Sequence, residues 1–380
     1  MLPLEGIRVI DLTHVLAGPC ATHQLRCLGA EVIKIERPGS GDVMRALATR
    51  PELQGLTPGF VALNAGKKSV AIDLGTADGL AALRRLVATA DVFVENFRPG
   101  AARRLGLAPE DIHALKPGIV YCSISGWGQV GPLAGLRAYD HVIQAATGMM
   151  ALQGAAAGEP PVKVGFPVVD IATGMSGAQA ILAALLRRAR GDTAPITLDV
   201  SMIDSALVLM AGVAAQTRAT GKAPPRIGNR GFVGSPGADT FATRDGFVSV
   251  AANTMGQYAR MCGALGRPDL AAPPHVPAGL APSAFLNDMA TPELRTQLAA
   301  AFAAMDSAPL EAALIAGGVP AARVRDVAEF LDELYSQTGR IDIPDVPMAL
   351  GPAFRWAGEP ALPLGPAPRL GQHNAELLGV

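Results

Sequence analysis

Residues 7–36 read IRVIDLTHVLAGPCATHQLRCLGAEVIKIE, and this stretch sets the architecture of the chain. Its two ends, residues 7–12 and 31–36, have the apolar character of buried strands. The segment between them can begin a helix at Pro19, because proline is tolerated at the first helical position, and Gly29 marks its end. A strand, a helix and a second strand in this order predict a βαβ unit, whose natural product is a parallel sheet with helices on its faces.

Similar units follow the first one. Further strands are expected at residues 69–72, 91–95, 119–123 and 196–200, and further helices at residues 77–90, 101–105, 109–115, 139–152, 171–190 and 202–220. The stretch between residues 38 and 68 is rich in Gly, Pro and Arg and is long enough to be a functional loop. The sequence therefore predicts an α/β fold with a Rossmann-like parallel sheet.

A composition change at residues 221–237, GKAPPRIGNRGFVGSPG, indicates a linker. Beyond it, residues 239–250 alternate like two strands around a turn at Arg244–Gly246. Helices are expected at residues 255–266, 291–304 and 323–334. We predict a large Rossmann-like domain from residues 1–220 and 321–380, with a linker and a smaller α/β domain at residues 221–320. The proline-rich tail from Ile343 can pack only by lying across another surface.

The composition argues against several classes of protein. The chain has 380 residues and a formal net charge of −1, so it offers no electrostatic footprint for nucleic acid or for a membrane surface. We expect neither a membrane-spanning segment nor a signal peptide. The four cysteines form no CxxC pair, which disfavours disulfides and structural zinc and fits a cytoplasmic protein.

The motifs of several common enzyme classes are not found where their chemistry needs them. The first strand leads into a helix without a G-x-G-x-x-G fingerprint, and no Walker A motif or G-x-S-x-G elbow occurs. Dinucleotide chemistry, ATP hydrolysis and serine hydrolysis are therefore disfavoured. The six histidines have no metal-ligand spacing, so no metal site is expected.

A second stretch, VGFPVVDIATG at residues 164–174, delivers Asp170 to the start of a long helical pattern. The simplest interpretation is that Asp170 caps the helix, because Asp is among the best N-cap residues. The alternative is that its carboxylate takes part in chemistry. Position alone leaves both interpretations open.

Arginines follow two of the expected strands. Arg37 comes just after the second strand, and Arg98 closes the segment Asn96–Arg98 after another. Ligands of open parallel sheets bind outside the carboxyl ends of the strands, and guanidinium groups match phosphate oxygens. Each arginine alone could be a solvated surface residue, but several at strand ends suggest a polyanionic ligand.

Several blocks in order along the chain resemble the family III CoA-transferases. They are LEGIRVIDLTHVLAGP, LGAEVIKIERPGSGD, NAGKKSVAIDL, DVFVENFRPGAARRLGL, SISGWGQVGP, the Asp170 stretch and LGQHNAELL. The family includes formyl-CoA and carnitine CoA-transferases, and α-methylacyl-CoA racemase is a relative. The resemblance implies a Rossmann-like large domain built from both chain ends, a smaller domain between them, and a homodimer whose two chains are interlocked like links.

The resemblance also implies an activity and its residues. CoA would move from an acyl-CoA thioester to a free carboxylic acid through acyl–aspartyl anhydride and aspartyl-CoA intermediates, with Asp170 as the nucleophile. CoA would be a substrate moiety rather than a permanently bound cofactor. Its contacts would be Arg37, Ile72, Asp73, Leu74, Gly75, Asn96, Phe97, Arg98, Arg104, Arg137, Ala138, Tyr139 and Asp140. We expect the N-terminus of the helix to hold Asp170 ionised.

Two departures from the family bear on the substrate. Leu16 stands where formyl-CoA transferases carry glutamine, which favours a short organic or dicarboxylic acid such as succinate. Tyr139 stands where racemases carry histidine, and His141 is expected on a nearly opposite helix face. A 2-methylacyl-CoA racemase that uses Asp170 as acid and base is the alternative, and a silent CoA-binding protein is a third hypothesis. The small domain and residues 228–237 are candidates to cover the site.

Overall fold

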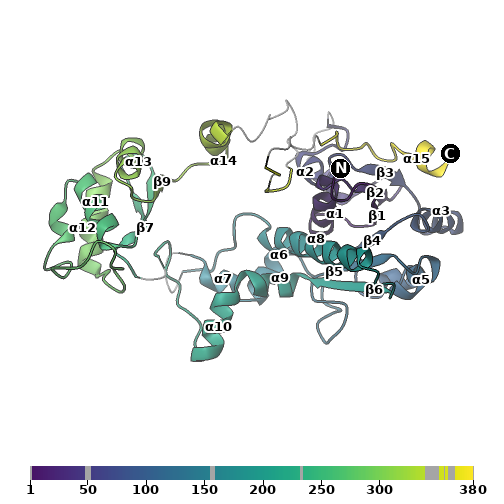
Figure 1. Cartoon of the computed structure of the whole chain (residues 1–380), viewed down its shortest axis with the longest axis horizontal. Coiled ribbons are helices and arrows are strands. Elements are labelled where there is room, and N and C mark those ends of the chain that lie inside the picture. The colour runs from purple at the N-terminus through teal and green to yellow at the C-terminus, as the bar shows by residue number, and fades with distance from the viewer. Residues whose placement is uncertain are drawn as a thin grey trace. The chain divides into compact units, whose positions relative to one another are not determined.

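The computed structural model describes residues 2–47, 53–154, 159–231, 234–338, 351–354, 356–357 and 364–379. These residues form two compact units (Figure 1). Unit 1 comprises the described parts of Met1–Gln153, Pro161–Pro224 and Ile343–Val380, so it is built from both chain ends. Unit 2 comprises the described parts of Gly154–Pro160 and Pro225–Asp342.

Unit 1 contains a parallel sheet with the strand order β3-β2-β1-β4-β5-β6. The strands are β1 (Arg8–Asp11), β2 (Glu31–Glu36), β3 (Lys68–Ala71), β4 (Val92–Glu95), β5 (Val120–Ser125) and β6 (Ile196–Ser201). This order is that of a doubly wound Rossmann sheet, in which the chain reverses its direction of travel between β1 and β4. The predicted parallel sheet is confirmed.

Helices cover both faces of this sheet (Figure 1). The pleat turns successive side chains to opposite faces, so two separate cores form. One core joins α1 (Ala17–Cys27) and α8 (Val168–Ala189) to the strands. The other joins α3 (Ala77–Val87) and α5 (Pro109–Leu115) to the opposite face. The remaining helices of unit 1 are α2 (Pro58–Asn64), α4 (Ala101–Arg104), α6 (Asp140–Ala146), α7 (Met149–Leu152), α9 (Met202–Leu209), α10 (Ala211–Thr220) and α15 (Asn374–Leu378).

Two predicted long helices are interrupted. The helix expected at residues 139–152 is split into α6 and α7 by Gly148, whose φ of 82° no regular helix can contain. The helix expected at residues 202–220 breaks at Met210, between α9 and α10. The described part of the expected loop at 38–68 contains a 3₁₀ turn (Val43–Ala46) and α2, whose start is marked by a Thr57 cap followed by proline.

Helix α8 packs tightly against α1 through small residues. A side chain on Gly174 would come within 2.6 Å of Cys20 Cβ, and one on Gly177 within 3.2 Å of Ala21 Cβ. Among the described residues, α8 is the one helix long and apolar enough to span a membrane by itself. Its buried residues Ala178, Ile181 and Ala184 instead belong to the core of unit 1.

Unit 2 is built on an antiparallel sheet of β7 (Gly237–Ala242), β8 (Phe247–Ala252) and β9 (Ala321–Arg323). The helices that pack in this unit include α11 (Met255–Ala264), α12 (Pro292–Ala303) and α13 (Ser307–Ala316), followed by α14 (Val327–Glu329) and a π-helical turn at Phe330–Tyr335. The predicted hairpin and the first two helices are present, whereas α13 was not predicted. The predicted boundary at residue 320 differs from the observed unit, because β9 pairs with β8 and keeps residues 321–338 with unit 2.

Candidate active site

A pocket of about 240 Å³ opens at the carboxyl ends of the central strands of unit 1. Its wall combines residues that end or follow β1, β2, β3 and β4, as expected for a ligand site in a doubly wound sheet. The lining residues are Leu12, His14, Ile35, Glu36, Arg37, Ile72, Asp73, Leu74, Gly75, Phe97 and Leu105.

The pocket brings together part of the predicted CoA-contacting set. Arg37, residues 72–75 and Phe97 line it. Arg98, Arg104 and Arg137 are exposed and do not line it. The lining residues that were not predicted from the sequence are Leu12, His14, Ile35, Glu36 and Leu105. The rule that selected Arg37, proximity to the carboxyl end of a strand, could also have selected Leu12, Ile35 and Glu36.

Unpaired cations are grouped in the same unit. The exposed Arg37, Arg98, Arg104 and Arg137 form no ion pair with any residue that the structure describes. By contrast, Arg103 pairs with Glu110 on the surface. Guanidinium groups left without a carboxylate are available for phosphate oxygens.

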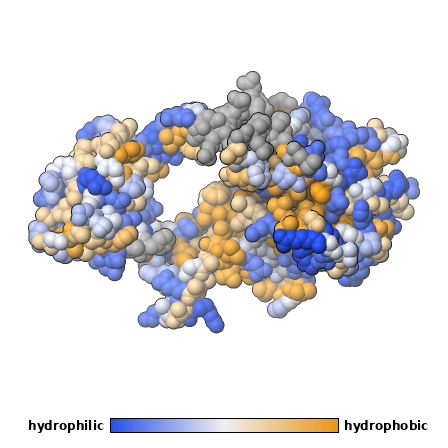
Figure 2. Space-filling model, viewed as in Figure 1, coloured by the Kyte–Doolittle hydropathy of each residue, from blue (hydrophilic) through white to orange (hydrophobic). Residues whose placement is uncertain are grey.

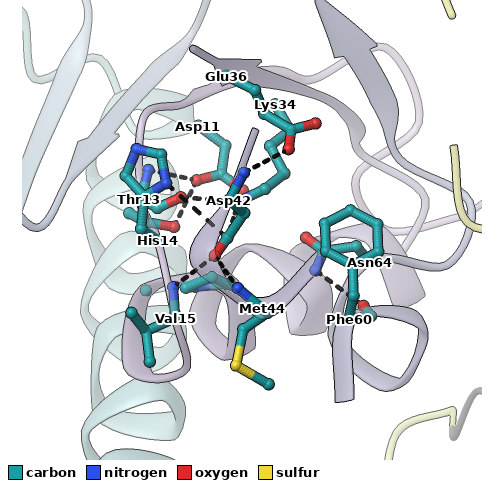
Figure 3. Close-up of polar contacts among 12 residues, drawn as sticks. Asp11, Thr13, His14, Val15, Lys34, Glu36, Asp42, Met44, Phe60 and Asn64 are labelled. Atoms are coloured by element: carbon teal, nitrogen blue, oxygen red, sulfur yellow. Dashed lines mark hydrogen bonds and ion pairs between the residues drawn. The ribbon is translucent and has the colours of Figure 1, made fainter. Parts of the chain in front are cut away.

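Buried ion pairs support the loops around the pocket. Lys67 pairs with Asp11 at 3.1 Å, and Arg45 pairs with Glu36 at 2.7 Å. Lys34 Nζ lies 2.9 Å from Asp42 Oδ2 and donates to Thr13 O at 2.7 Å (Figure 3). Burial would raise the pKa of Asp42, but Lys34 and the Met44 amide hold it below its usual range. Removing one partner of such a pair is costly, because the other charge is left buried and uncompensated.

These pairs hold the loop after β1 in a strained conformation. Val15 has φ 69°, which is rare for a β-branched residue and costs about 1–3 kcal/mol. Asp42 Oδ1 accepts the Val15 N–H at 3.1 Å (Figure 3). Asn96 accepts the His14 N–H at 2.9 Å and donates to His14 O at 2.8 Å. The side chain of Asn96, predicted to contact CoA, therefore fixes this loop.

Asp170 is the third residue of α8, in the first turn, and its side chain is half-buried. The cap of this helix comes from elsewhere in the chain. Asp140 Oδ2 accepts the N–H groups of Val169 at 2.8 Å and Asp170 at 3.0 Å. Gln144 Nε2 donates to Asp140 Oδ1, and Gln144 Oε1 accepts the Val164 N–H at 2.9 Å. Asp140 and Gln144 thus brace both ends of the segment that leads to Asp170.

This arrangement changes the expected ionisation of Asp170. Burial and the neighbouring Asp140 carboxylate raise its pKa from 3.8 to about 7. The expectation that the helix N-terminus holds Asp170 ionised was wrong, because Asp140 already occupies the first-turn amides and brings a like charge. A carboxylate of this pKa is more basic than an ordinary aspartate and changes charge near neutral pH.

The residues just before α6 also differ from expectation. Asp140 is buried, and its two oxygens accept the bonds described above. Tyr139 is 66% exposed, and its ring lies parallel to that of His141 with centroids 6.3 Å apart. The predicted placement of His141 on an opposite face was wrong, because Tyr139 is the extended N-cap of α6 and the helical angle does not apply to it. Ala138 packs in an apolar cluster with Ile143 and Val169.

One short loop joins the pocket to Asp170. His14 lines the pocket. A few residues later, Cys20 Sγ lies 4.0 Å from the carbonyl oxygen of Ile171, the residue after Asp170. The loop and the first turn of α1 thus run from the pocket wall to the Asp170 turn. Among the described residues, no cluster of His, Cys, Asp and Glu could hold a metal ion.

Comparisons with known proteins agree on one family. The model of CoA-transferase family III matches residues 4–374. The chain is 34% identical to a succinate–glutarate CoA-transferase of Agrobacterium fabrum, covering 99% of this chain and 95% of that protein. It is 35% identical to a succinyl-CoA:mesaconate CoA-transferase of Haloarcula hispanica, with coverage of 99% and 95%. A crystal structure of a CAIB/BAIF family protein from Brucella suis superposes with a TM-score of 0.88 at 32% identity, covering 100% of this chain and 99% of that one.

Proposed function

Because the chain belongs to CoA-transferase family III, we propose that it moves CoA between two short dicarboxylic acids with Asp170 as the nucleophile. The relatives from Agrobacterium fabrum and Haloarcula hispanica are named for succinate with glutarate and for succinyl-CoA with mesaconate, and succinate, glutarate and mesaconate are all dicarboxylates. The observation that carries the proposal is the half-buried Asp170 carboxylate with a raised pKa in the first turn of α8. The segment from His14 to Cys20 runs from the pocket wall to this turn, where Cys20 contacts Ile171.

The proposed reaction has four exchange steps at Asp170. The Asp170 carboxylate attacks the thioester carbonyl, the carbon–sulfur bond breaks, and an acyl–aspartyl anhydride and CoA thiolate result. The thiolate then attacks the aspartyl carbonyl, which releases the donor acid as a carboxylate and leaves an aspartyl-CoA thioester. The acceptor carboxylate reverses these two steps through a second anhydride, and Asp170 is regenerated as a free carboxylate.

The chain contributes basicity and placement to these steps. A pKa of about 7 makes Asp170 a stronger nucleophile than an ordinary carboxylate while leaving about half of it ionised at neutral pH. Asp140 and Gln144 fix the backbone that leads to Asp170, including the Asp170 amide itself. Orientation of this kind can equal an effective concentration of ~10⁵ M or more. The N-terminus of α1 has no side-chain cap, so its first-turn amides are our candidates to receive the oxyanion.

CoA would lie along the carboxyl ends of β1 to β4. Arg37 and residues 72–75 line the pocket, and the unpaired Arg98, Arg104 and Arg137 of the same unit would meet phosphate oxygens. The anhydrides need protection from water. Our candidate cover is the small domain with residues 228–237, of which residues 232–233 lie outside the described part of the chain.

We include a homodimer with interlocked chains in this proposal. Apolar side chains gather on unit 1 over α6 and α9 (Figure 2), and among them Val142 is 37% exposed and Val208 71%. Met175 of α8 is 56% exposed. Apolar surface of this kind usually marks an interface. Light scattering should give twice the 39.0 kDa mass of the chain. A monomer at micromolar concentration would refute the proposed homodimer. The four buried, free cysteines support a cytoplasmic location.

Racemisation of a 2-methylacyl-CoA is the second candidate. A carboxyl group with a pKa of about 7 also suits general acid–base catalysis, and His141 lies beside Tyr139 rather than opposite it. Incubation in heavy water separates the two activities. Deuterium at the α-carbon without CoA exchange would favour the racemase.

Intact-protein mass spectrometry tests the transferase. The protein is incubated with succinyl-CoA, with and without glutarate, and Asp170→Asn serves as the matched control. We expect a CoA adduct that hydroxylamine removes in the parent protein, and none in the variant, which should still bind CoA. Turnover by Asp170→Asn at the parental rate would contradict the assignment of the nucleophile.

A further inference from the structure

The closing segment, residues 364–379, lies against the outer edge of strand β3. As the edge strand of the sheet, β3 would expose a row of unpaired backbone groups. The closing segment pairs with them instead. The Ser69 N–H donates to His373 Nδ1 at 3.1 Å, the His373 N–H donates to Ser69 O at 3.0 Å, and the Ala71 N–H donates to Asn374 Oδ1 at 2.9 Å. Two side chains and one backbone amide therefore satisfy the groups that a further strand would otherwise pair with.

The segment is anchored on both sides of these contacts. Before them, Arg45 donates to Pro368 O at 3.1 Å, and the Gly66 N–H donates to Pro366 O at 3.0 Å. After them, Leu377 and Leu378 of α15 pack against the core on the α3 face of the sheet. Gly371, with φ 68°, makes the turn between the anchors.

The strand edge covered in this way leads directly into the pocket. Residues 72–75 follow β3 without a break and line the pocket. The N–H of Ile72, the first of these residues, donates to Glu36 O at 2.9 Å. A second connection runs through side chains, because the Gly371 N–H donates to Ser69 Oγ at 3.0 Å and the Ser69 hydroxyl donates to Glu36 Oε1 at 2.6 Å. Glu36 also lines the pocket.

We propose that the closing segment is a substrate-positioning element, in which His373 and Asn374 hold β3 so that residues 72–75 keep the shape that binds CoA. This rests on the proposed function, because the ligand of the pocket is taken to be CoA. Asp170 lies on α8, which packs on the other face of the sheet from α15. The segment should therefore affect CoA affinity and leave the chemical step unchanged.

Pairs of matched variants in the full-length chain test this. His373→Leu and Asn374→Leu remove the acceptors for the Ser69 and Ala71 amides. His373→Asn and Asn374→Asp keep an acceptor oxygen near the same place. Glu376→Gln weakens a surface ion pair between the closing segment and Lys68 of β3, and because exposed ion pairs contribute little, it serves as a control. The readouts are the Kd of CoA by calorimetric titration and the KM and kcat for succinyl-CoA.

We expect each leucine variant to raise the Kd and KM about fivefold or more at unchanged kcat, whereas the conservative variants and the control stay within about twofold. Parental Kd values in both leucine variants would overturn the proposal and leave the proposed function standing. A parent that does not bind CoA would overturn both. If a leucine variant does not fold, amide hydrogen exchange of the parent protein, with and without CoA, tests the proposal instead. CoA should slow the exchange of residues 68–75 and of residues 369–378 together. Protection of residues 68–75 alone would refute a positioning role.

Discussion

Replacing Asp140 by asparagine should shift the pH dependence of the reaction without dismantling the site. The variant keeps an oxygen to accept the Val169 and Asp170 amides but removes the negative charge beside Asp170. Burial and that charge together raise the pKa of Asp170 to about 7, and burial is the larger cause. We therefore expect the pKa to fall in the variant and to remain above 3.8.

The size of the effect follows from the ionised fraction. A tenfold rise in the acidity of Asp170, equivalent to about 1.4 kcal/mol, would raise its ionised fraction at pH 6 from roughly one tenth to roughly one half. At pH 8 the carboxylate is already largely ionised, so the only change is its lower basicity, which lowers the plateau rate.

The substitution also has a local cost at Gln144. Its amide group now donates to Asp140 Oδ1, and in Asp140→Asn a side-chain NH₂ takes the place of that oxygen. If Gln144 turns its amide to accept from the NH₂, it can no longer accept the Val164 N–H. The loss of this one hydrogen bond should lower the free energy of unfolding by about 0.5–1.5 kcal/mol.

The assay is the pH profile of kcat/KM between about pH 5 and 9, a range that spans the pKa of Asp170, for CoA transfer from succinyl-CoA to glutarate. The expected result is an acid limb moved to lower pH together with a lower plateau. Asp140→Ala provides a control, since it removes both the charge and the hydrogen bonds and should show the same shift with a larger loss of rate. An acid limb that stays in place in both variants would refute the assignment of that limb to Asp170 under the influence of Asp140.

Three further predictions concern the same unit. Gly174→Ala should destabilise the protein by about 1–3 kcal/mol in urea unfolding, because its methyl group would come within 2.6 Å of Cys20 Cβ, and parental stability would contradict the close packing of α8 on α1. Arg37→Ala should raise the KM for acyl-CoA with little change in kcat, whereas the surface-paired Arg103→Ala should change neither; equal effects would argue against a phosphate contact at Arg37. Asp170→Asn should raise the free energy of unfolding at pH 8, because the ionised carboxylate of the parent protein is disfavoured in the fold. This gain should vanish by about pH 4, where the carboxyl of the parent is protonated. A gain that does not depend on pH would refute the raised pKa.

The order of elements in unit 1 was readable from the sequence because strands and helices there have clear hydrophobic periods. Local signals were weaker elsewhere. Strand β9 has only three residues, too few for an alternating pattern to be recognised, and its pairing with β8 moved the boundary of unit 2. The break between α9 and α10 falls at Met210, whereas the nearby Gly212 lies inside α10, so no Gly or Pro marks the break itself.

Site residues could be predicted from the sequence only where a local pattern or a family motif pointed to a single position. Arg37 was found because it follows a strand, whereas residues 72–75 were implied only by the family resemblance. The support around them depends on contacts between distant parts of the chain. Asp140 caps a helix that starts 28 residues later, and Asn374 binds the backbone of Ala71 across 303 residues. No local sequence pattern predicts hydrogen bonds between residues this far apart in the chain. Val15 is a further case, because a β-branched residue at φ 69° contradicts its own preference and is held there by Asp42.

The sequence offered two interpretations of Asp170, a helix cap and a nucleophile, and one carboxylate could have served both purposes. In the structure a different carboxylate, that of Asp140, accepts the first-turn amides. A side chain that accepted those amides would have a lowered pKa and weaker nucleophilicity. With Asp140 as the cap, Asp170 is partly buried beside a like charge, and burial first and this charge second raise its pKa to about 7. The cap and the proposed nucleophile are thus separate residues, and the same contact that stabilises the helix makes Asp170 more basic.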